Sequence, residues 1–215
     1  TNIQVNSLSK LPNPIDEHEM LQELESISKK NKLIRSLIGD GFYQTLMPSV
    51  IKRNILENPA WYSAYTPYQP EISQGRLEAL FNFQTLIVEL TGLPIANASL
   101  LDEGSACAEA MILSQRACKS NRKRFYIADN LFNHCKNVLI TRALPLDIEL
   151  VPFEAKQKML TFSDAFGVIA PYIGADGEVS DISQINKATK DANIPLTITA
   201  DPLSLILLES PGKLG

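Results

Sequence analysis

One stretch decides how the fold of this chain is read, and it runs Trp61-Tyr62-Ser63-Ala64-Tyr65-Thr66-Pro67-Tyr68-Gln69-Pro70-Glu71-Ile72-Ser73-Gln74-Gly75-Arg76. The run is polar and has neither a helical nor a strand period. Each proline fixes its own φ and restrains the residue before it, so the run predicts a rigid loop. We predict that Thr66, Tyr68, Gln69 and Glu71 serve a ligand site, Glu71 as an anchor of the loop. Tyr62 and Tyr65 are expected to pack, which is also the alternative for Tyr68.

Upstream of this loop, Asp16 with Glu19 three residues later predicts the capped start of a helix. Pro48 predicts the start of a short helix over 48–58.

Downstream of this loop, the sequence alternates between helical and strand patterns. An apolar stripe predicts a helix over 77–90, which Gly92 and Pro94 end. A second helix is expected over 103–119. Short apolar strands and further helices then alternate, with strands at 124–128, 147–152, 165–171 and 196–200 and helices at 132–142 and 181–192. Strands separated by helices predict an α/β fold with a mainly parallel sheet.

The start of the helix at 103–119 is a candidate anion site. Gly104 and Ser105 stand where a turn opens the helix, and free amides together with the helix dipole suit a phosphate. The alternative is ordinary capping, in which Asp102 or Ser105 satisfies the same amides internally. Asp102 and Glu103 also bring negative charge to this position, which disfavours an anion.

Several tracts carry a resemblance to a known family. Tyr65 to Glu71, Ser73 to Glu78 and Leu100 to Gly104 resemble the P-protein of the glycine cleavage system, as do Ile38 to Tyr43 and Ala200 to Gly212. The resemblance implies the large domain of a fold-type I pyridoxal-phosphate-dependent transferase, here incomplete, over 61–215, after an N-terminal helical arm over 1–60. The chain begins without Met and ends in a Pro-Gly-Lys-Leu-Gly run, so we expect a fragment, and the resemblance implies that it belongs to the N-terminal half of the longer protein.

The resemblance also implies an activity, that of a glycine dehydrogenase (decarboxylating). Such an enzyme uses pyridoxal phosphate to decarboxylate glycine and passes the aminomethyl group to a lipoyl carrier protein. No lysine here follows a suitable strand, and the resemblance implies that the Schiff-base lysine lies in the C-terminal half and that the parent enzyme is a homodimer or heterotetramer. We therefore expect this fragment alone to be inactive. Two alternatives are a non-catalytic interaction module and another enzyme of the same fold, such as an aminotransferase or a cysteine desulfurase.

Two further residues gain a role only through this resemblance. In the fold, a carboxylate after a strand pairs with the pyridine nitrogen, and Asp201 stands at such a strand end. The other interpretation is an Asp bonded to nearby amides. Together with Gly104 and Ser105, Asp201 is expected to be a relic of a cofactor site. In proteins of this fold, aromatic residues stack on the cofactor near the position of His134. The family often has His-Pro-Gln-Thr there, whereas this sequence has Phe132-Asn133-His134-Cys135, so we expect His134 to be structural.

Composition excludes several other classes of protein. The net charge is −4, and the densest basic cluster lies at 119–124 near a helix end, which is too little for a nucleic-acid surface. The three cysteines have no Cys-x-x-Cys spacing, so neither a disulfide framework nor a metal site is expected, and two of them are expected to be buried on helices. With no apolar run long enough to cross a bilayer, we expect a soluble protein of a reducing compartment, either bacterial cytoplasm or mitochondrial matrix.

Overall fold

The computed structural model describes residues 11–118, 121–157 and 159–215. Their contacts divide the chain into two units, with the break between Ile38 and Gly39. The domain boundary that the sequence suggests at residue 60 stays a prediction. Each unit is described by itself.

The first unit holds helix α1 (Glu17–Ser28). Its start is as predicted, because the Asp16 side chain accepts a hydrogen bond of 2.8 Å from the amide of Glu19. This contact satisfies one of the free amides of the first turn. No residue of α1 is buried, although Leu21, Leu24 and Ile27 recur at helical spacing and are each about half exposed.

The second unit begins with helices that contribute little to its core. Helix α2 (Ser49–Ile51) continues directly into the π-helical turn η1 (Lys52–Leu56), in place of the single helix expected over 48–58. Helix α3 (Gln74–Thr91) starts three residues earlier than predicted and ends, as predicted, at Gly92, whose φ is +70°. None of its residues is buried, so the predicted apolar stripe of α3 has no core beneath it. Across the described ranges, no helix is both long and apolar enough to cross a membrane.

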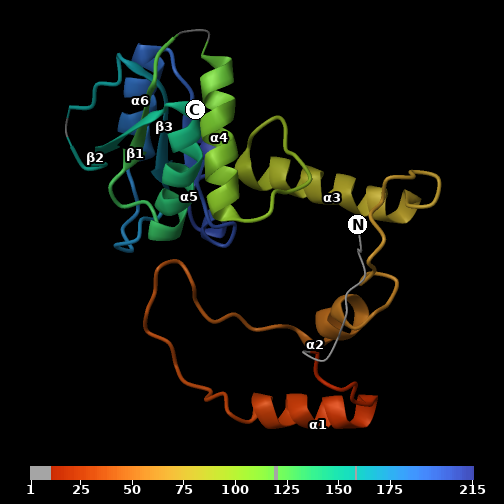
Figure 1. The fold of residues 1–215 in the computed structure, drawn as a ribbon. Coiled ribbons are helices and arrows are strands. Elements are labelled where there is room, and N and C mark those ends of the chain that lie inside the picture. Colours follow the sequence, from red (N-terminus) through yellow and green to blue (C-terminus); the bar gives the residue numbers. More distant parts are fainter. Residues whose placement is uncertain (1–10, 119–120, 158) are drawn as a thin grey trace, which may run out of the picture. The chain divides into compact units, whose positions relative to one another are not determined.

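A four-stranded parallel sheet forms the centre of the second unit (Figure 1). Its strands are β1 (Arg124–Ala128), β2 (Glu149–Phe153), β3 (Ala165–Pro171) and β4 (Leu196–Thr199), in the order β2-β1-β3-β4. Every pairing is parallel, which confirms the predicted sheet. All seven residues of β3 are buried, as expected for a central strand covered on both faces.

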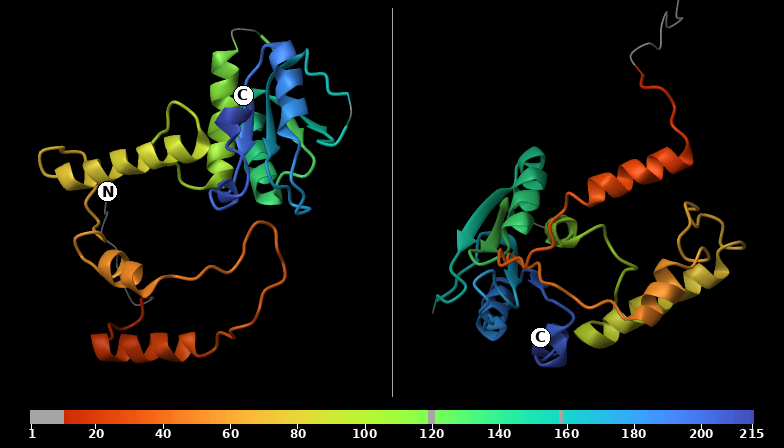
Figure 2. Two further views of the ribbon diagram at one scale, coloured as in Figure 1. Left: turned by 180° about the vertical axis from the view of Figure 1, so that it is seen from behind. Right: turned by 90° about the horizontal axis from the view of Figure 1, so that it is seen from below.

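Helices cover both faces of this sheet (Figures 1 and 2). Helices α4 (Glu103–Ala117) and α5 (Asn133–Ala143) pack together on one face, and α6 (Ile182–Ala192) lies on the other. Alternate residues of β1 follow this division, because Phe125 and Ile127 join the core with α4 and α5, whereas Ala128 joins the core with α6. Short turns η2 (Leu144–Leu146) and η3 (Ser204–Ile206) and helix α7 (Pro211–Leu214) complete the unit.

Close packing between α4 and the sheet depends on Gly167. A methyl group there would lie 2.8 Å from the Cβ of Ser114 on α4 and 2.9 Å from the ring of Phe125. Contacts so short are not tolerated in a packed interior, so this glycine lets α4 approach β3. The close approach sets the distance between the last turns of α4 and the first half of β3.

Candidate cofactor-like cavity and loop site

The largest described cavity opens at the carboxyl ends of the strands and has a volume of about 1120 Å³. This edge is where open parallel sheets usually bind their ligands. Its walls come from several places in the second unit: the loop at 39–43, two residues after α3, the first half of α4, the segment after β1, the residues after β3, and β4 with the residues that follow it. Of the residues predicted as a cofactor relic, Asp201 lines the cavity, whereas Gly104 and Ser105 do not.

Asp201 is engaged by the chain itself. Its Oδ1 accepts a hydrogen bond of 2.9 Å from the amide of Leu203, as in the interpretation of Asp201 as a strand-end cap. Its Oδ2 accepts a hydrogen bond from the hydroxyl of Tyr43, which is 158 residues away in the sequence. The bond to Asp201 raises the pKa of Tyr43, so the phenol stays protonated and remains a donor at neutral pH.

One of the first amides of α4, that of Ser105, is also satisfied within the chain. The Oδ1 of Asp102 accepts a hydrogen bond of 2.7 Å from the amide of Ser105, so the capping interpretation describes this end of the helix. That bond from the Ser105 amide lowers the pKa of Asp102. Gly104 is buried, and a methyl group on it would lie 2.9 Å from Cγ2 of Val138 on α5. A packing requirement between α4 and α5 therefore explains this glycine without a phosphate.

His134 lies in an aromatic setting at the start of α5. Its ring stacks on Phe132, with centroids 5.8 Å apart and an interplanar angle of 16°, and tilts against Phe42 at 5.3 Å. Its Nε2 is 3.1 Å from Oε2 of Glu103. These contacts hold the imidazole ring in a fixed orientation. The sequence did not point to Phe42 or Glu103 as neighbours of His134, nor to Phe42 or Tyr43 as residues that line the cavity.

The residues present do not fit bound pyridoxal phosphate. The Ser105 amide is taken by Asp102, and the carboxylates of Asp102 and Glu103 stand at the end where a phosphate would need positive charge. Gly41 lies against the outer edge of the Phe132 ring, since a methyl group on Gly41 would be 3.2 Å from two of its carbons. Among the described residues that line the cavity there is no lysine.

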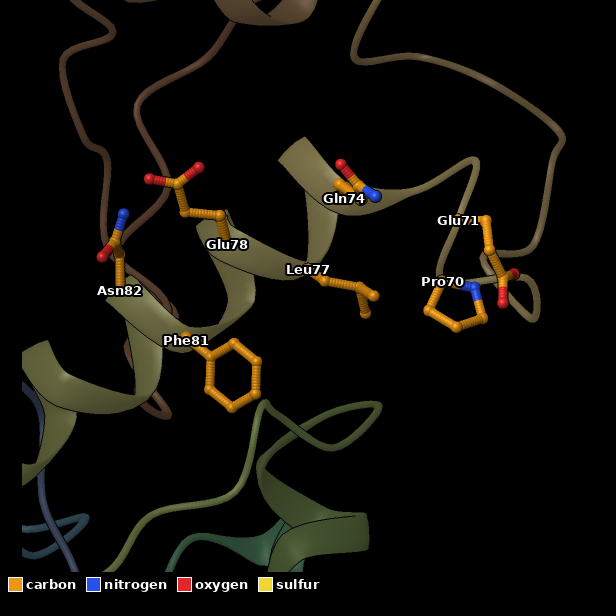
Figure 3. A pocket seen from close by; sticks show the side chains of 7 residues that line it. All are labelled: Pro70, Glu71, Gln74, Leu77, Glu78, Phe81 and Asn82. Atoms are coloured by element: carbon orange, nitrogen blue, oxygen red, sulfur yellow. The ribbon is translucent and has the colours of Figure 1, made fainter.

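The loop predicted to serve a ligand is exposed and borders a different hollow. Pro70 and Glu71 face the first turns of α3 across an open groove of about 480 Å³ (Figure 3), and none of the residues 66–71 lines the large cavity. Arg76 holds the loop, because its guanidinium donates to the backbone oxygen of Tyr65 at 2.9 Å. Tyr68 is 87% exposed, so packing does not explain it within this chain. Tyr62 and Tyr65 are also exposed, at 60% and 43%, and their predicted packing is wrong here.

Comparison with families of known proteins gives a match along the whole sequence. The family model described as Glycine cleavage system P-protein covers residues 1–215. Among curated proteins, the glycine dehydrogenases (decarboxylating) of Gluconobacter oxydans (strain 621H) and Allorhizobium ampelinum are each 50% identical to the chain, over 201 and 204 residues. These alignments take in 94% of this chain but 21% of each relative, so the chain spans about a fifth of their length.

Two solved structures resemble this fold. A glycine decarboxylase (P-protein) of the glycine cleavage system, in inhibitor-bound form, superposes with a TM-score of 0.88 at 30% identity, over 98% of this chain and 49% of that one. A putative O-acetylhomoserine (thiol)-lyase from Campylobacter jejuni, which carries a pyridoxyl-lysine phosphate, superposes with a TM-score of 0.52 at 12% identity, over 72% of this chain and 41% of that one. The second likeness concerns the fold alone.

Proposed function

This chain belongs to the Glycine cleavage system P-protein family, as its sequence predicted, and from that premise we propose that it is part of a glycine dehydrogenase (decarboxylating). The observation that carries the proposal is the 50% identity to such enzymes over 94% of the chain, together with the same fold. The whole protein would decarboxylate glycine with pyridoxal phosphate and pass the aminomethyl group to a lipoyl carrier protein. The cofactor supplies the electron sink for that reaction when it is bound.

In this proposal the cofactor is held by the remainder of the protein, not by residues 39–215. Lys213 is the one lysine that follows Asp201 in this sequence, and its amine pairs with Glu209 at 3.0 Å. Its side chain is 71% exposed, so nothing fixes the amine against a reacting atom. The amide of Ser105 and the carboxylate of Asp201 already have partners within the chain, which also supports cofactor binding by the rest of the protein.

The loop of Thr66, Tyr68, Gln69 and Glu71 is the contribution that we assign to this chain. Its prolines hold the polar groups in fixed directions, and the Tyr68 hydroxyl is free to donate or accept a hydrogen bond with a group brought by the rest of the enzyme. Placed beside the glycine carboxylate or the developing negative charge, such a donor would stabilise the transition state.

An exchange assay on the full-length gene product tests the activity. Glycine labelled in its carboxyl group should exchange label with carbon dioxide when pyridoxal phosphate and the lipoyl carrier protein are present. Without the carrier the exchange should fall strongly. Absence of exchange from a folded, cofactor-loaded protein would overturn the proposal, whereas carrier-independent transamination would favour another enzyme of the same fold.

A second candidate, a non-catalytic interaction module, is favoured by the uncovered apolar surface. Helix α3 has no buried residue, and Phe81 on it is 67% exposed. After β4, Leu207 is 90% exposed. Because isolated domains rarely leave such surfaces open, we expect a partner, which could be the C-terminal half or another P-protein subunit. Co-expression with the coding sequence of that half should solubilise the chain, whereas a monodisperse, cooperatively melting chain alone would contradict this.

A further inference from the structure

A second group of side chains, distinct from the proposed loop site, gathers where α4 and α5 begin. Glu103 is the first residue of α4, and His134 and Cys135 lie in the first turn of α5. A carboxylate oxygen of Glu103, a ring nitrogen of His134 and the Sγ of Cys135 all lie within 4.8 Å of one another. Oxygen, nitrogen and sulfur donors from two helices thus converge on one point.

From this convergence we propose a binding site for one zinc-class divalent cation, with Glu103, His134 and Cys135 as its protein ligands. Thiolate and imidazole favour Zn²⁺ over Mg²⁺ or Ca²⁺, which prefer oxygen donors. In tetrahedral zinc sites the ligand atoms lie about 2.0–2.3 Å from the ion, which places them roughly 3.3–3.8 Å from one another. Because no two of these atoms are more than 4.8 Å apart, no pair has to close by more than about 1.5 Å.

Glu103 is the ligand that must move to close the site, and its side chain is free to do so. The Glu103 side chain is 44% exposed and can swing, whereas Cys135 is fully buried and fixed by packing. The Oε2 of Glu103 already stands 3.1 Å from Nε2 of His134. The cation would replace this hydrogen bond with two bonds to itself and leave α4 and α5 in place.

A fourth donor and an open path support a cation here. Cys107, one turn after Glu103 on α4, is buried beside Cys135, and the two thiols form a hydrogen bond. Cys107 therefore supplies a fourth donor close to the site. Glu103 and Cys107 both line the large cavity, which gives an ion a path from solvent.

Charge and protons balance at this site. On binding, a metal–sulfur bond forms and the thiol proton leaves to solvent. The resulting thiolate and the Glu103 carboxylate together offset the double positive charge of the ion. Affinity should therefore fall as the pH is lowered.

The test is metal titration of the full-length gene product, stripped with EDTA and kept reduced with a phosphine. Co²⁺ serves as the spectroscopic probe, because a thiolate ligand gives a cobalt charge-transfer absorption, and Zn²⁺ is then added to displace it. We expect Cys135→Ser to remove this absorption and one bound ion per chain. Glu103→Gln and His134→Gln should each weaken binding at least tenfold.

The chain offers matched controls. Cys118 and His18 are the cysteine and the histidine outside this cluster, so Cys118→Ser and His18→Gln should leave the cobalt spectrum and the stoichiometry unchanged. Since Glu103 is partly exposed, Glu103→Gln should fold normally even if Cys135→Ser does not. Equal cobalt spectra in wild type and Glu103→Gln would overturn the site. Failure of the reduced wild type to bind either ion, or formation of a Cys107–Cys135 disulfide in place of metal binding, would overturn it as well.

Discussion

Replacing Gly104 by alanine separates the two explanations for this glycine, close approach of a phosphate or close approach of two helices. On the structure, the new methyl group would lie 2.9 Å from Cγ2 and 3.3 Å from Cβ of Val138. Rotation of the Val138 side chain cannot relieve both contacts, because its Cβ moves only with the backbone of α5. Alanine should therefore force α4 and α5 apart by a few tenths of an ångström.

The size of the effect follows from opposing terms. Alanine is favoured over glycine in a helix by up to about 1 kcal/mol, and less in the first turn. Overpacking a buried site costs about 1–3 kcal/mol, and the β-branched Val138 has little freedom to adapt. The packing cost should win, with a net local loss of about 1 kcal/mol. Gly75 provides the matched control, because it is likewise the second residue of its helix and has nothing within 4 Å of its added methyl group. Gly75→Ala should be neutral or stabilising by about 0.5 kcal/mol.

Hydrogen exchange of α4 and α5 peptides in the full-length gene product measures this local stability. Gly104→Ala should speed exchange about fivefold in both helices, which corresponds to about 1 kcal/mol. In a Val138→Ala background the same change should cost little, since Cγ2 is gone. A coupling free energy near zero in this double-mutant cycle, or slower exchange in Gly104→Ala, would refute the packing argument.

Three further outcomes follow from the contacts described above. Tyr68→Phe should slow glycine decarboxylation by the full-length protein at least tenfold, which is about 1.4 kcal/mol in the activation barrier. Its melting temperature should not change, since the exposed ring adds nothing to the core. Equal rates with a lower melting temperature would count against the loop site. Asp102→Ala should destabilise α4 at pH 7. The bond from the Ser105 amide lowers the pKa of Asp102 in the folded state. The stability that Asp102 contributes is therefore complete above its unfolded-state pKa of about 3.9 and is lost as the pH falls through its lower folded-state pKa. The difference in melting temperature between wild type and Asp102→Ala should shrink below about pH 4. Borohydride trapping of the isolated chain with pyridoxal phosphate should give scattered adducts on exposed lysines, and one stoichiometric, glycine-responsive adduct would contradict the assignment of the cofactor to the rest of the protein.

The sequence predicted those features that depend on neighbours along the chain. The caps at Asp16 and Asp102, the end of α3 at Gly92 and the alternation of strands and helices are all local, and the structure has each of them. The helix predicted over 48–58 is present over 49–56, but its second half is a wider π-helical turn, which no residue pattern indicated. The sequence predicted the apolar stripe of α3, but such a stripe does not indicate whether this chain or a partner covers it.

Contacts between distant segments could not be predicted in the same way. The bond between Tyr43 and Asp201 spans 158 residues, and that between Glu103 and His134 spans 31. Periodicity does not encode such distances, since they depend on how α4, α5 and the sheet pack. The cysteine spacing argued against a metal site because it considered one segment at a time, whereas the cluster of Glu103, His134 and Cys135 joins the ends of two helices.

The difference between the cavity and the loop indicates where this chain meets the chemistry of its enzyme. In the cavity, the carboxylate of Asp201 and the amide of Ser105 already have partners within the chain, so a ligand would have to break these bonds before forming its own. In the loop, among the described residues, the hydroxyl of Tyr68 and the carboxylate of Glu71 form no hydrogen bond or ion pair with the chain. Groups held in direction by prolines but left without partners lose little on binding, since neither an internal bond nor much backbone freedom is given up. The loop, and not the cavity, is therefore the surface of this chain at which a partner half and its substrate should be sought.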